Sequence, residues 1–274
     1  MARWILRAFQ AISLSGLLLT ATGAAAAQTA RATPKVVRSL APEGRLRVAI
    51  NLGNTVLAQK DPATGKLGGV TVVLAEALGK RLGVPVEMTS YDAAGKVFDA
   101  LEKGAWDVAF LGNEPERAQK IDFTPPYVFI DGTYLVRKDS PIRGVEDADK
   151  PGYKITVGRG AAYDLFLTRN LKNAQLVRGD TGAVALATFK SEKLDAMAGV
   201  RQFLMDAAEK DPSLRVLDSS FMRIDQSVAV PRGRSPQATR FVRQFLEEMK
   251  ANGTVRRALD ESGQRGAKVA PPAK

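Results

Sequence analysis

Two charged residues, Glu114 and Arg117, follow an apolar stretch where they could do chemistry. They lie in GNEPERAQKIDFTPPY (112–127), directly after WDVAFL (106–111), an apolar run typical of a buried strand. A guanidinium presents a planar pair of donors that matches a carboxylate. The side chain of Arg117 therefore faces either an acidic ligand or a neighbouring carboxylate, Glu114 or Glu116, on a solvated loop.

A second stretch with binding chemistry is ITVGRGAAYD (155–164). Here a predicted strand ends, two glycines turn the chain and a helix begins. Backbone N–H groups around Gly160, Ala161 and Ala162 are free in such a turn and can receive a carboxylate, aided by the helix dipole. The side chain of Arg159 adds positive charge. The alternative is an ordinary strand-to-helix turn without a ligand.

The composition excludes several kinds of catalytic site. The 274 residues include no His and no Cys, which excludes Ser-His-Asp and Cys-His nucleophilic sites and argues against zinc. We expect no metal and no cofactor. The net charge is +11, but basic residues occur in pairs, without long runs or interleaved aromatic residues. We therefore expect no nucleic acid partner.

The elements that must position these residues follow a repeated α/β pattern. Strands are predicted at 45–52, 86–91 and 106–111, with helices at 70–83 and 96–104 between them. The pattern then recurs, which indicates a second α/β unit. Its predicted strands are 133–139, 153–158, 174–179, 194–200, 214–218 and 226–231, and its predicted helices are 161–172, 181–193 and 202–211.

Two such units predict a cleft between two lobes. Open α/β sheets bind ligands outside the carboxyl ends of their strands. GNEPER follows the strand 106–111 and so should line the cleft, and the loop after the first strand adds Asn54 as a further candidate ligand-binding residue. A last helix at 235–253 has Ser235 at its N-cap and Pro236 at its first position, and should pack on a core.

Both ends of the chain read differently from its middle. Residues 1–27 have two arginines, an apolar stretch and a small-residue end, the pattern of a cleavable signal peptide, so the mature protein should be exported. Residues 28–43 are predicted to be a flexible leader and 263–274 a disordered tail.

The chain from 45 to 262 resembles the family 3 extracellular solute-binding proteins. The resemblance is carried by GKLGGVTVVLAEALGKRLG, ALEKGAWDVAF, an Arg before KIDFTPPYV, ITVGRGAAYD and KLDAM. These proteins are periplasmic receptors of polar amino-acid ABC importers. The resemblance implies a two-lobed type II periplasmic-binding-protein fold, in which two crossover strands, TYLVRKD and QSVAVP, join two α/β lobes. Lobe 1 would comprise 44–131 plus 229–262, and lobe 2 would comprise 132–228.

The resemblance also implies roles for particular residues. Arg117 occupies the position of the arginine that clamps the ligand's carboxylate in the family. This chain departs from the family pattern at Ala161, where a Ser or Thr is usual, and at Asn113 and Glu114, which replace Thr or Ser donors. Val200 stands where amino-acid binders commonly have an Asp that holds the ammonium group.

These departures leave two ligand classes open. Either Glu114 holds an ammonium group, or the ligand is a small organic anion with Arg201 as a second clamp; the overall resemblance favours an amino acid. The leading hypothesis is a monomeric periplasmic receptor that delivers its ligand to the membrane permease of an ABC transporter. The alternative is a periplasmic enzyme on the same scaffold, such as a cyclohexadienyl dehydratase-like lyase, with Glu114 as its acid.

Overall fold

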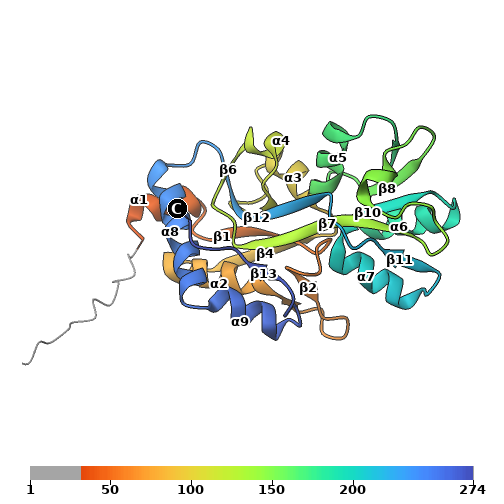
Figure 1. Cartoon of the computed structure of the whole chain (residues 1–274). Helices are drawn as coiled ribbons and strands as arrows, with labels where there is room; N and C mark the ends of the chain where they lie inside the picture. The colour runs from red at the N-terminus through yellow and green to blue at the C-terminus, as the bar shows by residue number, and fades with distance from the viewer. Residues whose placement is uncertain (1–31, 274) are drawn as a thin grey trace, which may run out of the picture. The chain divides into compact units, whose positions relative to one another are not determined.

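The computed structural model describes residues 32–273. The predicted signal peptide (1–27) and residues 28–31 of the predicted leader lie outside the described residues. Within 32–273, no helix is both long enough and apolar enough to span a bilayer. This part of the chain forms one large mixed sheet, with helices packed on both of its faces (Figure 1).

The sheet consists of two parallel halves joined by two long antiparallel strands. Its main path runs β4-β1-β5-β12-β7-β10-β8-β9. β1 pairs in parallel with β4 and β5, β8 pairs in parallel with β10 and β9, and β12 and β7 pair antiparallel between these halves. The bounds are β1 Leu46–Asn51, β4 Val86–Tyr91, β5 Val108–Gly112, β7 Val128–Arg137, β8 Lys154–Gly158, β9 Gln175–Gly179, β10 Ala196–Val200 and β12 Met222–Pro231.

The helices divide between the two halves. In Figure 1, α2, α8 and α9 lie at one end of the sheet, and α5, α6 and α7 lie at the other. The helices are α1 Pro34–Leu40, α2 Val70–Leu82, α3 Ala94–Glu102, α4 Pro115–Ala118, α5 Ala162–Asn170, α6 Gly182–Ser191, α7 Arg201–Lys210, α8 Pro236–Ala251 and α9 Thr254–Glu261. The short elements are β2 Gln59–Lys60, β3 Leu67–Gly68, β6 Ile121–Phe123, β11 Leu214–Val216, β13 Lys268–Val269 and a 3₁₀ turn Val145–Ala148.

Helix α2 shows why the sequence patterns succeed. Val70, Leu74, Leu78 and Leu82 recur four residues apart, and all four are buried in the core. Gly83 then adopts a left-handed conformation (φ 72°), and its N–H donates to carbonyls of the last turn, which ends the helix there. The predicted helix 70–83 is thus confirmed within one residue.

Helix α8 confirms the predicted start of the last long helix. The Ser235 hydroxyl accepts a hydrogen bond from the N–H of Ala238 at 3.2 Å, and Pro236 occupies the first helical position. The sequence did not predict α9. Gly253, predicted to end the helix 235–253, has φ 78° and is also the N-cap of this further helix, whose Val255, Ala258 and Leu259 are buried.

The predicted flexible leader was wrong for residues 34–43. Thr33 caps α1, since its hydroxyl accepts from the N–H of Val36, and Pro34 stands at the first helical position. Val36 and Leu40 are buried against the core. The Thr-Pro pair was read as a loop signal, but a cap followed by proline is equally a helix start.

The predicted disordered tail was wrong for residues 264–273. Lys268 and Val269 form β13, which pairs antiparallel with Phe129 and Val128 of β7. The flanking Ala267 and Ala270 are buried. The polar, Pro-rich composition of the tail gave no sign of this pairing, because β7 supplies the partner.

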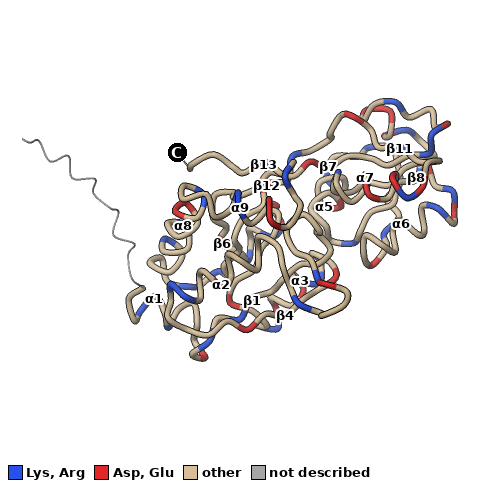
Figure 2. Tube along the Cα trace, turned by 90° about the horizontal axis from the view of Figure 1, so that it is seen from below, with Lys and Arg blue, Asp and Glu red and all other residues tan. Residues whose placement is uncertain are grey.

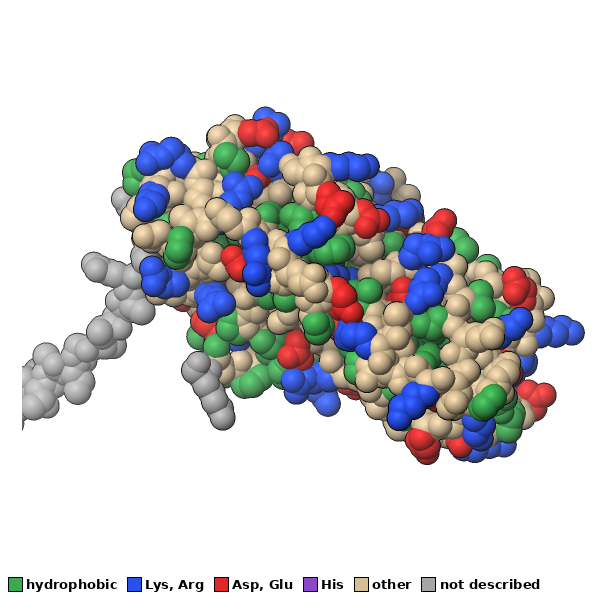
Figure 3. Space-filling view, turned by 90° about the horizontal axis from the view of Figure 1, so that it is seen from above, with side chains coloured by type: hydrophobic (Ala, Val, Ile, Leu, Met, Phe, Trp, Pro, Cys, Tyr) green, Lys and Arg blue, Asp and Glu red, His purple; other side chains and the backbone are tan. Residues whose placement is uncertain are grey.

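The division into lobes remains a prediction in its detail. The boundaries at 131/132 and 228/229 fall inside β7 and β12, the two strands that the resemblance implied as crossovers. The described residues, 32–273, form one compact unit. Acidic and basic residues are interspersed along the chain in both halves (Figure 2), and their side chains are intermixed on the face that Figure 3 shows.

Candidate functional site

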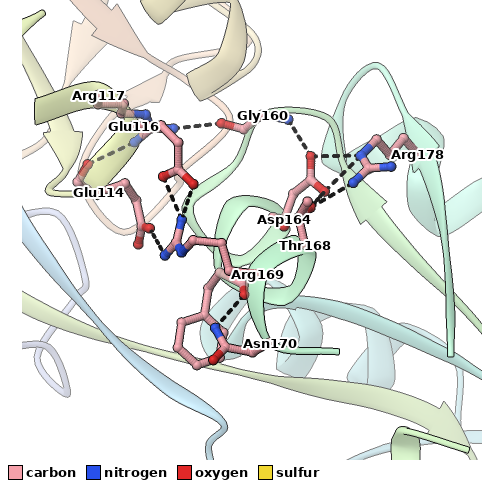
Figure 4. Close-up of polar contacts among 11 residues, drawn as sticks. Glu114, Glu116, Arg117, Gly160, Asp164, Thr168, Arg169, Asn170 and Arg178 are labelled. Carbon is pink, nitrogen blue, oxygen red and sulfur yellow. Dashed lines mark hydrogen bonds and ion pairs between the residues drawn. The ribbon is translucent and has the colours of Figure 1, made fainter. Parts of the chain in front are cut away.

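Arg117 reaches the interior because a single helical turn follows β5. β5 ends at Gly112. Glu114 is the N-cap of α4, and Pro115 is the first residue of that helix. This turn directs Arg117 inward, where it is 1% exposed. Its Nη1 donates to the Gly112 carbonyl at 2.9 Å, and its Nη2 donates to the Gly160 carbonyl of the other half at 2.6 Å (Figure 4).

The buried guanidinium of Arg117 lacks an anionic hydrogen-bond partner in the described residues. Its two hydrogen bonds go to neutral carbonyls, and its Nε–H is buried without a partner. Burial lowers the pKa of Arg117 to about 10, although the nearby Glu114 and Glu116 raise it. The group therefore stays charged at neutral pH and has a donor to spare.

The turn between β8 and α5 supplies the opposite wall. Gly160 has φ 67°, which favours glycine, and its N–H donates to the Asp164 carboxylate at 2.8 Å. The N–H of Ala161 donates to the Gly158 carbonyl at 3.1 Å. These two amides are therefore not free, contrary to the prediction. Ala162 stands at the first position of α5, where helix geometry gives an N–H no partner within the helix.

Close backbone contact brings the two halves together at this turn. A Cβ on Gly160 would lie 2.8 Å from the Cα of Gly95, at the start of α3 in the first half. A Cβ on Gly95 would lie 2.7 Å from the carbonyl of Arg159. Both positions therefore need glycine for the halves to approach this closely.

A cavity lies between the two halves beside Arg117. The space that its lining residues surround, including the open mouth, is about 490 Å³. Apolar lining comes from residues such as Ala162, Val200 and Ile224. The polar and charged side chains that line it are Asn51, Asn54, Asp92, Arg117, Arg159, Tyr163 and Gln226.

Two neutral amide side chains add hydrogen-bonding capacity. Asn54 is 6% exposed, and its Oδ1 is buried without a hydrogen-bond partner among the described residues. Gln226, 5% exposed, projects from β12. Asn54 is one of the predicted site residues. Gln226 is not, since its one sequence signal is a polar side chain at the start of the predicted strand 226–231.

The structure brings together only some of the predicted site residues. Asn54, Arg117, Arg159 and Ala161 line the cavity, and Gly160 accepts a hydrogen bond from Arg117 beside it. Arg159 stands at the mouth, with its side chain 60% exposed and paired to Asp180. Those outside the cavity lining are Asn113, Glu114 and Arg201.

Glu114 instead belongs to an interlobe ion-pair cluster of Glu114, Glu116 and Arg169. Arg169, on α5, donates to Glu114 at 2.5 Å and to Glu116 at 2.6 Å (Figure 4). The sequence analysis missed Arg169, since its partners lie more than 50 residues away. Asn113 is exposed, and only its N–H is engaged, by the carbonyl of Asp225.

Burial affects the pKa values of Glu114 and Arg169 to different extents. Burial raises the pKa of Glu114, and the hydrogen bond from Arg169 does not cancel that shift. Burial would lower the pKa of Arg169, but the two carboxylates raise it above its ordinary value. The difference arises because the Glu114 side chain is 5% exposed and that of Arg169 is 33% exposed. The cost of burial therefore falls mainly on the carboxylate.

The side chain of Arg201 does not line the cavity but binds a neighbouring segment of the chain. Its guanidinium donates to the carbonyls of Leu217 at 2.8 Å and Asp218 at 2.9 Å, and to the Ser220 hydroxyl at 2.8 Å. It therefore holds the segment after β11 and does not act as a second clamp in this conformation. Arg201 was expected in the cavity because it directly follows Val200, which stands at a ligand-binding position of the family.

Comparison with known proteins places these features in a family. The family described as bacterial extracellular solute-binding proteins, family 3, matches residues 46–263. A glutamine-binding protein of Geobacillus stearothermophilus is 26% identical over 206 residues, 73% of this chain and 78% of that protein. The L-cystine-binding protein TcyJ of Escherichia coli K12 is 28% identical over 202 residues, 72% of this chain and 74% of that protein.

Solved structures agree on the fold. The ancestral amino acid-binding protein AncCDT-1, described as a precursor of cyclohexadienyl dehydratase, has a TM-score of 0.69 and 27% identity to this chain. The match covers 83% of this chain and 98% of that one. The fold is that of type II periplasmic binding proteins, with two α/β lobes joined by two crossover strands, as the sequence predicted.

Proposed function

Since the chain belongs to the bacterial extracellular solute-binding proteins of family 3, we propose that it is a periplasmic receptor. It captures a small amino acid or a related small carboxylate between its lobes and delivers it to the membrane permease of an ABC transporter. It acts as a monomer and catalyses no reaction. Relatives named as glutamine- and cystine-binding proteins support this proposal.

The observation that carries the proposal is the buried Arg117 beside the interlobe cavity. A fully buried cation without an anionic partner is costly, and a ligand carboxylate would complete it. A planar guanidinium with a spare Nε–H offers the geometry for such a carboxylate. Arg117 thus serves as the central ligand-binding residue, with Asn54 and the α5 turn around it.

The contacts between lobes suggest how capture works. Arg117 bonds the Gly160 carbonyl, and Arg169 bonds Glu114 and Glu116, so the same elements that line the cavity also hold the lobes together. Strands β7 and β12 connect the lobes and are the natural hinge. Separation of the lobes opens the cavity, and closure around a ligand removes it from water.

Measurements of ligand binding, of lobe closure and of cellular uptake test this function. Isothermal titration calorimetry and thermal shift should detect a stabilising small carboxylate, and small-angle scattering should give a smaller radius of gyration with that ligand than without it. Uptake of the same compound by cells should depend on this protein. Identical scattering curves with and without a bound ligand would count against capture by closure.

A lyase on this scaffold is the second candidate. The similarity to a dehydratase precursor favours it, and Glu114 has a raised pKa, as a general acid requires. However, Glu114 faces Arg169 outside the cavity lining. Incubation with cyclohexadienyl carboxylates followed by product analysis decides between the two, and turnover that is lost in Glu114→Gln would favour the lyase.

A further inference from the structure

The charges around the cavity do not balance. Among the described side chains that line it, Arg117 is the only buried charged group. Asp92, at the mouth, is 61% exposed and pairs with Lys96 at 2.8 Å. Arg159, also at the mouth, pairs with Asp180 at 3.2 Å. These two pairs cancel, which leaves one positive charge inside the cavity.

Within residues 32–273, no side chain that lines the cavity interior offers a negative charge for an ammonium group. Glu114 is engaged by Arg169 outside the cavity lining. Val200 contributes an apolar side chain at the end of β10, and the buried amides Asn54 and Gln226 are neutral. The ammonium group of an amino acid would enter the cavity interior without a carboxylate to pair with among the lining residues. A simple carboxylate would neutralise the buried positive charge.

We propose that the cavity selects a small monocarboxylate that lacks an amino group, such as a hydroxy acid or an unsubstituted acid. This inference rests on the proposed function as a carboxylate receptor and narrows its ligand class. The Arg117 guanidinium binds the carboxylate, and the buried Oδ1 of Asn54 accepts from a ligand hydroxyl. Apolar contacts from Val200 and Ile224 take the rest of the ligand.

The test compares acids that differ only at the α-substituent. Mature protein is titrated with lactate and alanine, glycerate and serine, and phenyllactate and phenylalanine, with propionate added as an unsubstituted acid. Thermal shift gives a first ranking, and calorimetry gives each Kd. We expect the preferred acid to bind at least about 10-fold more tightly than its amino counterpart, because a buried ammonium without a partner is unfavourable.

A designed change at Val200 should reverse this preference. Val200 is the N-cap of α7 and makes no side-chain capping bond. Aspartate and asparagine are both good N-caps, so Val200→Asp and Val200→Asn suit the local backbone equally. Only Val200→Asp adds a negative charge to the cavity. We expect it to gain at least about 10-fold in affinity for the amino acids relative to Val200→Asn.

The outcomes separate this inference from the proposed function. Preference for the acids without an amino group supports both. Preference for amino acids in the wild-type protein overturns the inference and leaves the receptor function standing. Binding of neither series overturns both. If Val200→Asp fails to fold, as judged by circular dichroism, the wild-type ranking alone decides.

Discussion

Two arginines, Arg117 and Arg169, each donate hydrogen bonds to residues of the other lobe, but the charges of their partners differ. Arg169 is one-third exposed and binds two carboxylates, Glu114 and Glu116. Arg117 is fully buried and binds only the neutral carbonyls of Gly112 and Gly160, with its Nε–H unpartnered. Arg169 is hydrogen-bonded to its counter-ions, whereas no carboxylate among the described residues is hydrogen-bonded to Arg117, although Glu114 and Glu116 lie near enough to raise its pKa.

The difference in partners suggests two tasks: Arg169 holds the lobes together, and Arg117 recognises a ligand. An ion pair that is partly exposed to water, such as that of Arg169 with Glu116, contributes little, about 0–1 kcal/mol, because water screens it. A buried cation without a counter-ion is unfavourable until an anion arrives. We therefore propose that Arg169 stabilises the closed arrangement of the free protein, and that Arg117 makes binding depend on a carboxylate. Removing each arginine in turn sharpens the contrast.

The largest effect is expected for Arg117→Met. Methionine keeps much of the side-chain volume but removes the charge and all five donors. The affinity for the ligand carboxylate should fall about 100-fold or more, as expected when one partner of a buried ion pair is lost. Calorimetry with the preferred acid measures this loss. An affinity within about threefold of the wild type would remove Arg117 from the site.

Arg169→Met should have a smaller effect on affinity. It removes two interlobe ion pairs, each contributing about 0.2–1 kcal/mol, so the apparent affinity should fall about 2- to 30-fold. Scattering of the ligand-free variant should show a larger radius of gyration than the wild type. Arg81→Met is the matched control, since Arg81 pairs with Glu248 within one half at 2.8 Å. A control that opens the lobes equally would refute the assignment.

A still smaller effect on binding is expected for Glu114→Gln, together with a change in pH dependence. Burial raises the pKa of Glu114 above its ordinary 4.5 in the folded state. Its contribution to stability is therefore fully present below pH 4.5 and is lost as the pH rises through the folded-state pKa. Urea unfolding from pH 4 upward should show the variant gaining stability relative to the wild type as the pH rises. The opposite trend would mean that Arg169 outweighs burial.

Arg201→Met should leave ligand affinity unchanged but lower stability. Its hydrogen bonds to the carbonyls of Leu217 and Asp218 are lost, and bonds to charged groups contribute about 1.5–3 kcal/mol. The melting temperature should fall by several degrees, roughly 2–8 °C. A selective loss of binding with unchanged melting would restore Arg201 as a second clamp.

Local signals in the sequence predicted the fold well where caps and periodicity act within one element. The spacing in α2 and the Ser235 cap of α8 are examples, and Arg117 was placed at the cavity because it follows β5. The Thr33-Pro34 start of α1 was also visible but was interpreted as a loop.

Contacts between distant segments were not predictable in the same way. Glu114 was expected at the ligand, yet Arg169 reaches it from a helix of the other lobe. The carbonyl partners of Arg201 and the pairing of β13 with β7 likewise depend on chain segments far away in sequence. A single sequence shows which groups are charged, but the packing of the lobes decides which of them meet.

We infer that a ligand carboxylate supplies the anionic hydrogen-bond partner of Arg117. A crystal structure of the protein with its preferred acid tests this most directly. We expect carboxylate oxygens within about 2.7–3.2 Å of the Arg117 guanidinium, including its Nε. The interlobe ion-pair cluster of Glu114, Glu116 and Arg169 should remain intact. A bound acid held by Arg159, Arg169 or Arg201, with Arg117 still bonded only to the Gly112 and Gly160 carbonyls, would contradict it.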